Sequence, residues 1–138
     1  MVAYSFMRRF AEPIVERTKG GTIRGDRARG HAKPDDELQL YQGMRTRQCR
    51  LISREKCLGL ARILLNLRKG LVVLGEPIGV TRMKAFARID SDRGLNIFAR
   101  FDGFETWDQL AIFWTDTHDA TGALAWHVRW LPFPPGIL

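Results

Sequence analysis

The chain has 138 residues, 45% of them hydrophobic and 27% charged, which predicts a single globular domain over residues 1–138 with a core of its own. No apolar run approaches the roughly 20 residues of a membrane-spanning helix, and the N-terminal MVAYSFMRRF lacks the pattern of a signal peptide. Cys49 and Cys57 fit no metal-binding or redox spacing. We therefore expect a cytoplasmic protein with reduced thiols, no metal, no cofactor and no membrane association.

The net charge of +7 is concentrated in the first half of the chain. Residues 1–69 carry 16 Lys and Arg against 7 Asp and Glu, whereas residues 70–138 carry 6 against 8. This asymmetry is expected when one face of a protein meets phosphates. Arginine outnumbers lysine, and its planar guanidinium both binds phosphates and stacks on bases. The alternative is a generally basic surface, but we favour a nucleic-acid partner.

The first predicted element is a short helix in FAEPIVERTK (10–19). Phe10, Ile14 and Val15 have helical spacing there, and Pro13 is compatible only with a first turn. We expect the helix to end at Gly20-Gly21, because the pair breaks helical order.

Strands are predicted over most of the middle of the chain. ELQLY (37–41) alternates, and CRLISREKCLGLARILL (49–65) indicates one long or two consecutive strands. LVVLG (71–75) is a short apolar run that should end in a Gly-Glu-Pro turn, and VTRMKAFARI (80–89) alternates again. The segments on either side of DSDRG (90–94) then predict a hairpin, or a strand leading into a loop.

The clearest predicted helix is ETWDQLAIFWTDTH (105–118). Its Trp107, Leu110, Ala111 and Trp114 form one apolar face, which favours a place in the core for both tryptophans. Thr106 with Gln109 resembles a capping box, and Glu105 is a competing start. The chain returns to alternation in ALAWHVRWL (123–131), and the prolines of PFPPGIL (132–138) exclude a central strand.

Many short strands with one early and one late helix predict an α+β fold: a small β-barrel of about five to seven strands with the two helices packed on it. Among catalytic motifs, the three histidines have no metal-binding spacing, and the glycine-rich segment near residue 20 lacks the ending of a phosphate-binding P-loop. Neither metal catalysis nor nucleotide hydrolysis is therefore indicated.

The segment RTKGGTIRGDR (17–27) resembles the signature of ASCH domains, which are RNA-associated relatives of the PUA fold. The family pattern has a Lys, then Thr three residues later, then Ile-Arg; here these are Lys19, Thr22, Ile23 and Arg24. The resemblance implies a PUA-like barrel with a cleft beside this loop. It covers roughly residues 4–131.

Two later segments also resemble the family. KPDDELQLY (33–41) is similar to its Pro-Gly-Asp turn before a barrel strand, with Asp35 where Gly is usual. ARFDGFETWDQLAIFW (99–114) is similar to its later segment, in which an acidic residue and Gly-Phe precede a helix.

The resemblance implies binding of RNA or a modified nucleoside at an electropositive cleft. Solvated loop charge is the alternative for each individual side chain. The residues expected to form this surface are Arg24, Arg27, Arg29, Lys33, Tyr41, Arg45 and Arg47.

One branch of the family hydrolyses acetylated cytidine with a Lys, a Thr and a Glu. By resemblance, Lys19 and Thr22 take the first two positions, and Asp102 takes the third, with Glu105 as the nearby alternative. Thr22, or a water it holds, would attack the acetyl carbonyl, Lys19 would accept the proton and Asp102 would hold the cytosine amine. An Asp in place of Glu shortens this side chain. The structural alternative is that these residues only shape a loop and a turn.

A third alternative is a ribonuclease, an activity also attributed to some ASCH proteins. It would need a general base and acid near a ribose hydroxyl, for which Lys19, Tyr41 and His31 are the candidates. The sequence leaves binding, amide hydrolysis and RNA cleavage open, with binding as the leading hypothesis and protein partners undetermined.

Overall fold

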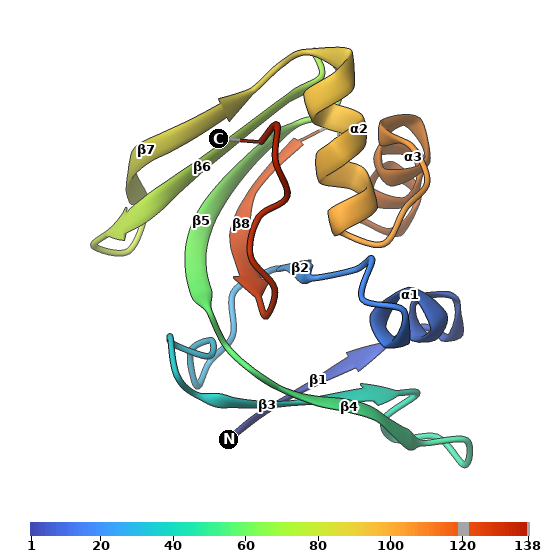
Figure 1. Ribbon diagram of the computed structural model, residues 1–138. Coiled ribbons are helices and arrows are strands. Elements are labelled where there is room, and N and C mark those ends of the chain that lie inside the picture. Colours follow the sequence, from blue (N-terminus) through green and yellow to red (C-terminus); the bar gives the residue numbers. More distant parts are fainter. Residues whose placement is uncertain (119–121, 138) are drawn as a thin grey trace.

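The computed structural model describes residues 1–118 and 122–137, which form an α+β domain, as predicted (Figure 1). One sheet has three strands in the order β1 (Val2–Phe6), β3 (Glu37–Gln42) and β4 (Arg50–Lys56). The other has five, in the order β2 (Gly21–Arg24), β8 (Gly122–Arg129), β5 (Gly59–Asn66), β6 (Leu71–Ile78) and β7 (Arg82–Ile89). The helices are α1 (Ala11–Val15), α2 (Asp92–Phe101) and α3 (Trp107–His118).

The predicted small β-barrel is not confirmed, because the eight described strands divide between two sheets. The sheets are joined where β4 runs into β5, a nearly continuous path in Figure 1. At this corner the Cys57 amide donates to the Asp36 carbonyl of the smaller sheet, and the next amide, of Leu58, donates to the Arg129 carbonyl of the larger one. On the other side, β1 and β2 are edge strands that form no ladder with each other within the described residues. The domain is therefore open between β1 and β2.

The early helix is shorter than predicted and ends at Val15 rather than at the glycine pair. Gly20 and Gly21 instead allow close packing, because a Cβ at Gly20 would lie 2.6 Å from Leu131 Cβ and one at Gly21 would lie 2.7 Å from His127 Nε2. The Gly20 amide donates to the Phe101 carbonyl, and its carbonyl accepts from Trp130. Because these two glycines have no side chains, the start of β2 packs closely between α2 and the C-terminal tail.

The predicted strands are present, with two corrections. The long segment 49–65 forms two consecutive strands, β4 and β5. The expected Gly-Glu-Pro turn after LVVLG is wrong, because β6 continues through Gly75, Glu76 and Pro77. The pairing register shifts between Leu74 and Gly75, and β7 pairs with β6 on both sides of the shift. The described part of the tail, residues 132–137, contains no strand, and Leu138 lies outside the described residues.

The loop or hairpin expected around DSDRG is also wrong, because α2 begins there. The Ser91 side chain caps the helix by accepting a hydrogen bond from the Gly94 amide at 3.1 Å. Leu95, Phe98 and Ala99 then face the sheet at helical spacing and are buried. Gly94 is a helical residue whose missing side chain leaves room for Ile89 and Ser91.

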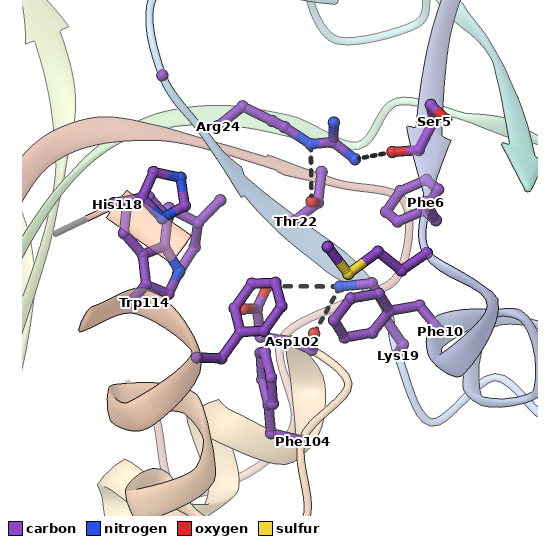
Figure 2. A pocket seen from close by; sticks show the side chains of 14 residues that line it. Ser5, Phe6, Phe10, Lys19, Thr22, Arg24, Asp102, Phe104, Trp114 and His118 are labelled. Atoms are coloured by element: carbon purple, nitrogen blue, oxygen red, sulfur yellow. Dashed lines mark hydrogen bonds and ion pairs between the residues drawn. The ribbon is translucent and has the colours of Figure 1, made fainter. Parts of the chain in front are cut away.

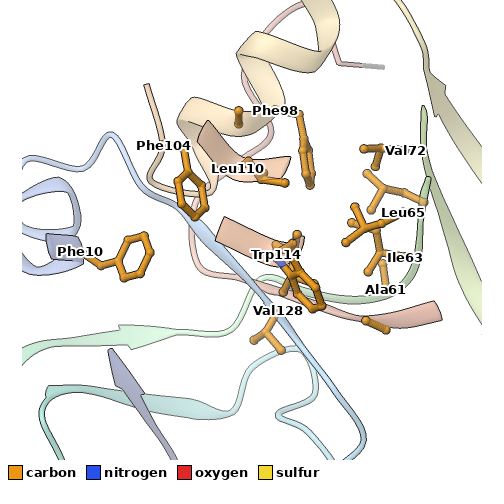
Figure 3. Packing of buried hydrophobic residues seen from close by; sticks show 14 of the residues in the cluster. Phe10, Ala61, Ile63, Leu65, Val72, Phe98, Phe104, Leu110, Trp114 and Val128 are labelled. Atoms are coloured by element: carbon orange, nitrogen blue, oxygen red, sulfur yellow. The ribbon is translucent and has the colours of Figure 1, made fainter. Parts of the chain in front are cut away.

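The core lies between the helices and the larger sheet and continues between the two sheets (Figure 3). Phe98 of α2 packs over Ile63, Leu65 and Val72, all of which are at or near full burial. The predicted helix α3 buries Trp107, Leu110 and Trp114 as expected, and Thr106 accepts a hydrogen bond from the Gln109 amide at 3.2 Å. No helix in the described part of the chain has the length and apolar character needed to cross a membrane.

Candidate functional site

A cavity of about 220 Å³ lies in the opening between β1 and β2, with α3 and the end of α2 on its other side (Figure 2). Lys19, Thr22 and Asp102, the three residues assigned to catalysis by resemblance, all line it. The other lining residues come from β1, β2 and their neighbouring turns and from the region of α3: Ser5, Phe6, Met7, Phe10, Ile23, Arg24, Gly25, Phe104, Phe113, Trp114 and His118.

Asp102 is placed by the way α2 ends. It is the C-cap residue, and Gly103 follows with a φ of 98°, a left-handed conformation that favours glycine. The Phe104 amide donates to the Ala99 carbonyl and the Gly103 amide to the Arg100 carbonyl, which is the Schellman arrangement of a helix end. The sequence Asp-Gly-Phe therefore turns the chain so that Asp102 and Phe104 both face the cavity.

Lys19 enters the cavity from the short segment between α1 and β2. Its side chain is almost fully buried, and Nζ donates to the Gly21 carbonyl at 2.7 Å and to the Asp102 carbonyl at 2.5 Å. The ammonium thus satisfies a carbonyl at the C-terminal, negative end of α2. It also lies 4.9 Å from the ring centre of Phe10 and 5.4 Å from that of Phe6. Burial lowers the pKa of Lys19 to about 8, although Asp102 opposes the shift.

Asp102 faces Lys19 across the cavity floor, with its Oδ1 atom 3.6 Å from Nζ. Burial raises the pKa of Asp102 to about 6, against the opposing effect of the Lys19 charge. Oδ1 is buried and accepts no hydrogen bond from the described residues. Because buried polar atoms are nearly always paired, an acceptor left open at a cavity indicates a donor supplied by a ligand or by water.

Thr22 and Arg24 are two residues apart on β2, and both line the cavity. Arg24 Nε donates to Thr22 Oγ1 at 3.1 Å, and its Nη2 donates to the Ser5 carbonyl at 2.7 Å, which joins the edges of β1 and β2 (Figure 2). The Thr22 hydroxyl hydrogen remains available, because its oxygen is the acceptor in this bond. Arg24 is therefore part of the cavity wall, and its guanidinium lies 4.7 Å from the Phe6 ring centre.

Aromatic side chains form the rest of the cavity wall, and sequence reasoning missed them as site residues. Phe10 packs edge to face against Phe104 and Phe113, at centroid distances of 5.4 and 5.8 Å, and the rings of Phe104 and Phe113 are tilted at 5.2 Å. Trp114 is buried, as the apolar face of the helix predicted, yet it also lines the cavity and stacks with His118 at 3.9 Å. The Phe immediately after Asp-Gly was the available signal for Phe104, whereas nothing local marked Phe6 or Phe10.

Glu105, the alternative acid, lies outside this cavity. It is exposed and borders a separate groove beside α3, while its amide donates to Gln109 Oε1. Of the two acidic residues, Asp102 alone lines the cavity with Lys19.

The other expected nucleic-acid-binding residues do not line the cavity. Arg27 is exposed, with its guanidinium 5.2 Å from the Tyr4 ring centre, and Tyr41 is half-buried, with its hydroxyl donating to Gln39. The 43–49 turn is joined to the cavity wall by a hydrogen bond from the Met44 amide to Ser5 Oγ. The remaining expected residues are exposed in loops: Arg29, Lys33, Arg45 and Arg47.

His31, a candidate for ribonuclease chemistry, also lies outside the cavity. Its ring nitrogens interact with the Tyr4 hydroxyl at 2.9 Å and the Gly25 carbonyl at 2.7 Å, and burial lowers its pKa. Lys19, Tyr41 and His31 are therefore not gathered in this one cavity.

Within residues 1–118 and 122–137, no three His, Cys, Asp or Glu side chains lie close enough to hold a metal ion. The comparisons gave no match to a family model, to a curated protein or to a solved structure.

Proposed function

We propose that this protein binds a nucleobase that carries an exocyclic amine or amide, either within RNA or as a modified nucleoside. The observation that carries the proposal is the open acceptor Asp102 Oδ1, buried at the floor of an aromatic-lined cavity. The Lys19 ammonium offsets the charge of Asp102 but donates no hydrogen bond to Oδ1, and an N–H group of a bound base would supply this missing donor.

The dimensions of the cavity favour a base rather than a whole nucleotide. Its volume of about 220 Å³ is below the roughly 300 Å³ at which pockets for drug-sized ligands begin, so a single ring system fits and the sugar and phosphate remain outside. Flat aromatic walls and the half-buried Arg24 suit a planar polar group. The exposed Arg27 and Arg29 follow Arg24 in the chain and are available for the phosphates.

The same residues connect the proposal to the ASCH family. Lys19, Thr22 and Asp102 are the three positions that the resemblance assigns to its cleft, and all three line the one cavity. We include in the proposal that the domain is a PUA-like barrel left open between β1 and β2. The gap that makes the barrel incomplete is also where the cavity lies.

The test compares cytidine with uridine by titration calorimetry at pH 8. Asp102 is ionised there and accepts only, so the amine of cytidine should bind at least about tenfold more tightly than the carbonyl of uridine. Asp102→Asn keeps the shape but adds a donor, and should reduce or reverse this preference. Equal affinities for the two nucleosides in the wild type would contradict the proposal.

Hydrolysis of an acetylated cytidine is a second candidate, favoured by the opposite pKa shifts of Lys19 and Asp102. In the reactive form, Lys19 is neutral and Asp102 is protonated. Lys19 takes the Thr22 proton as the hydroxyl oxygen bonds to the acetyl carbon, and Asp102 gives its proton to the departing cytosine amine. Water then attacks the acetyl ester of Thr22 while Asp102 takes a proton from the water and Lys19 returns its proton to the departing Thr22 oxygen. Both groups regain their starting forms, and the products are acetic acid, which ionises to acetate, and cytidine.

Arg24 assists this reaction in the second candidate. Its Nε already donates to Thr22 Oγ1, so it stabilises the negative charge that develops on this oxygen as the proton leaves. Release of acetate from N-acetylcytidine is the decisive assay. Tight binding without release would leave the binding proposal standing and exclude the hydrolytic one.

A further inference from the structure

A second cavity lies against the C-terminal tail and is lined by residues of β5, β7, β8 and the tail. Its volume is about 210 Å³, and its walls include Gly59, Ala61, Phe86, His127, Arg129 and Phe133. It shares no lining residue with the first cavity. None of these residues has a part in the proposed nucleobase chemistry.

His127 is the most unusual group in this wall. Its side chain is 1% exposed, and neither ring nitrogen makes a hydrogen bond with the described residues. The ring packs parallel to Phe133, with the centroids 5.9 Å apart and 15° between the planes. A buried imidazole normally has at least one partner, and these two nitrogens have none within the described residues.

Arg129 supplies a positive charge in the same wall. Its guanidinium lies 4.5 Å from the Phe133 ring centre, and Nη1 donates to the Leu131 carbonyl at 3.2 Å. No carboxylate pairs with it within residues 1–118 and 122–137. Arg129 is half-buried, and this burial lowers its pKa. A half-buried guanidinium without an acidic partner is free to pair with an anion that enters the cavity.

The remaining walls are flat and apolar. On β7, Ala87 pairs with Leu74 and Ala85 with Gly75, so Phe86 is the extra residue of a β-bulge. A bulge re-aims a side chain, and here it brings Phe86 to the cavity with 47% of its surface exposed. Gly59 keeps the space beside the guanidinium open, because a Cβ there would lie 2.9 Å from Arg129 Nε.

We propose that this cavity binds a small carboxylate with a flat, apolar body. The carboxylate pairs with the Arg129 guanidinium, the apolar body lies against Phe86 and Phe133, and His127 completes the polar contacts. Arginine matches a carboxylate through two parallel N–H donors, and aromatic rings favour a planar body. The site is separate from the proposed nucleobase cavity, so either can exist without the other.

The test uses benzoate as the probe, with binding followed through the NMR signals of the His127 ring protons. Wild-type protein at about 10 mM benzoate should show saturable shifts, because a site of millimolar affinity is then mostly filled. Arg129→Gln should weaken binding by about tenfold or more, since a charged hydrogen-bonded pair is lost. Acetate, which has the charge without the ring, should bind about tenfold more weakly than benzoate.

Two further variants keep the result interpretable. Arg24→Gln removes a half-buried arginine from the other cavity and should leave benzoate binding unchanged. Phe86→Ala removes a half-exposed ring that the fold does not need, and should weaken binding several-fold. Absence of His127 shifts in the wild type, equal affinity in wild type and Arg129→Gln, or a loss caused by Arg24→Gln would each overturn the proposal.

Discussion

Asp102 Oδ1 and Lys19 Nζ lie 3.6 Å apart, although 83 residues separate them in the chain and both side chains are almost fully buried. Two further hydrogen bonds hold the ammonium, to the carbonyls of Gly21 and of Asp102 itself. Moving two charges out of water is costly, and their attraction offsets the cost only if both are present. Each residue therefore depends on the other, and together they tie the end of α2 to the start of β2.

A double-mutant cycle tests this dependence. Lys19→Met and Asp102→Asn should each lower the free energy of unfolding by about 3–5 kcal/mol, because each leaves one buried charge without its partner. The double variant should lose about 1–3 kcal/mol less than the sum of the two. Urea unfolding at pH 7 measures all four proteins.

The matched control for this cycle is the exposed pair Arg54–Glu37, whose atoms are also 3.6 Å apart. Arg54→Met and Glu37→Gln should couple by no more than about 1 kcal/mol, because water screens the pair. If Lys19 and Asp102 coupled as weakly as this pair, they would not act as a buried unit.

The sequence-based predictions identified the polar floor of the cavity better than its walls. Lys19, Thr22 and Asp102 could be named because a Lys-x-x-Thr-Ile-Arg segment and an Asp-Gly-Phe segment are short, local patterns. Asp35 was expected to occupy a glycine position, and its φ of 76° is in the left-handed region that glycine favours. Such turns depend on a few neighbouring residues, so a sequence can indicate them directly.

The features that were missed depend on contacts between distant segments. β1 and β2 were not predicted from the sequence, and a local pattern does not say whether two strand edges pair, so the division of the strands into two sheets was not foreseeable. The helix α2 was missed because the segments around DSDRG (90–94) were taken as a hairpin or as a strand leading into a loop. Its apolar face, with Leu95, Phe98 and Ala99 at helical spacing, was present in the sequence.

Thr22 offers a clean test of the hydrolytic candidate. Thr22→Val keeps the shape of the side chain and its place against β8, but lacks the hydroxyl, and should reduce acetate release from N-acetylcytidine by at least about 10³-fold. Thr22→Ser retains the hydroxyl and should keep most of the activity. Equal rates in the valine and serine variants would exclude Thr22 as the nucleophile.

The pH profile of the same reaction follows from the Lys19–Asp102 pair. The reactive form carries one proton shared between the two groups, so kcat/KM should be bell-shaped, with limbs near pH 6 and pH 8. Below pH 6 both groups are protonated and Lys19 cannot accept a proton. Above pH 8 both have lost their protons and Asp102 cannot donate one. A rate that rose steadily through pH 9 would be incompatible with Asp102 as the proton donor.

The buried His127 should make stability depend on acidity. Burial lowers its pKa to about 3 from the usual 6.5, so the unfolded chain binds a proton that the folded chain does not between these values. Stability should therefore fall as the pH is lowered from 6.5 towards 3. His127→Leu should remove this loss of stability. The unfolding free energy of the variant should therefore rise relative to that of the wild type by a few kcal/mol as the pH falls.

Comparing the wild type with His127→Leu also cancels the effect of Asp102 on the pH dependence of stability. Its raised pKa acts in the opposite direction, because the folded state then binds the extra proton and gains stability as the pH falls from 6 to about 4. Since Asp102 is present in both proteins, it does not contribute to the difference. A difference in unfolding free energy that stayed constant between pH 7 and pH 4 would show that His127 is not buried in neutral form.

Gly103 links the backbone of the α2 terminus to the position of Lys19. A Cβ at Gly103 would lie 2.8 Å from Lys19 Cδ and 2.9 Å from Phe10 Cδ1, and the φ of 98° is unfavourable for any other residue. Gly103→Ala should therefore lower stability by about 1–3 kcal/mol and displace Lys19, which weakens cytidine binding. Gly25→Ala is the matched control, because Gly25 lines the same cavity but has no atom within 4 Å of its Cβ position. Urea unfolding should show a loss of stability, and calorimetry a loss of cytidine affinity, for Gly103→Ala but not for Gly25→Ala. Equal stability and equal affinity in the two variants would show that the turn at Gly103 does not place Lys19.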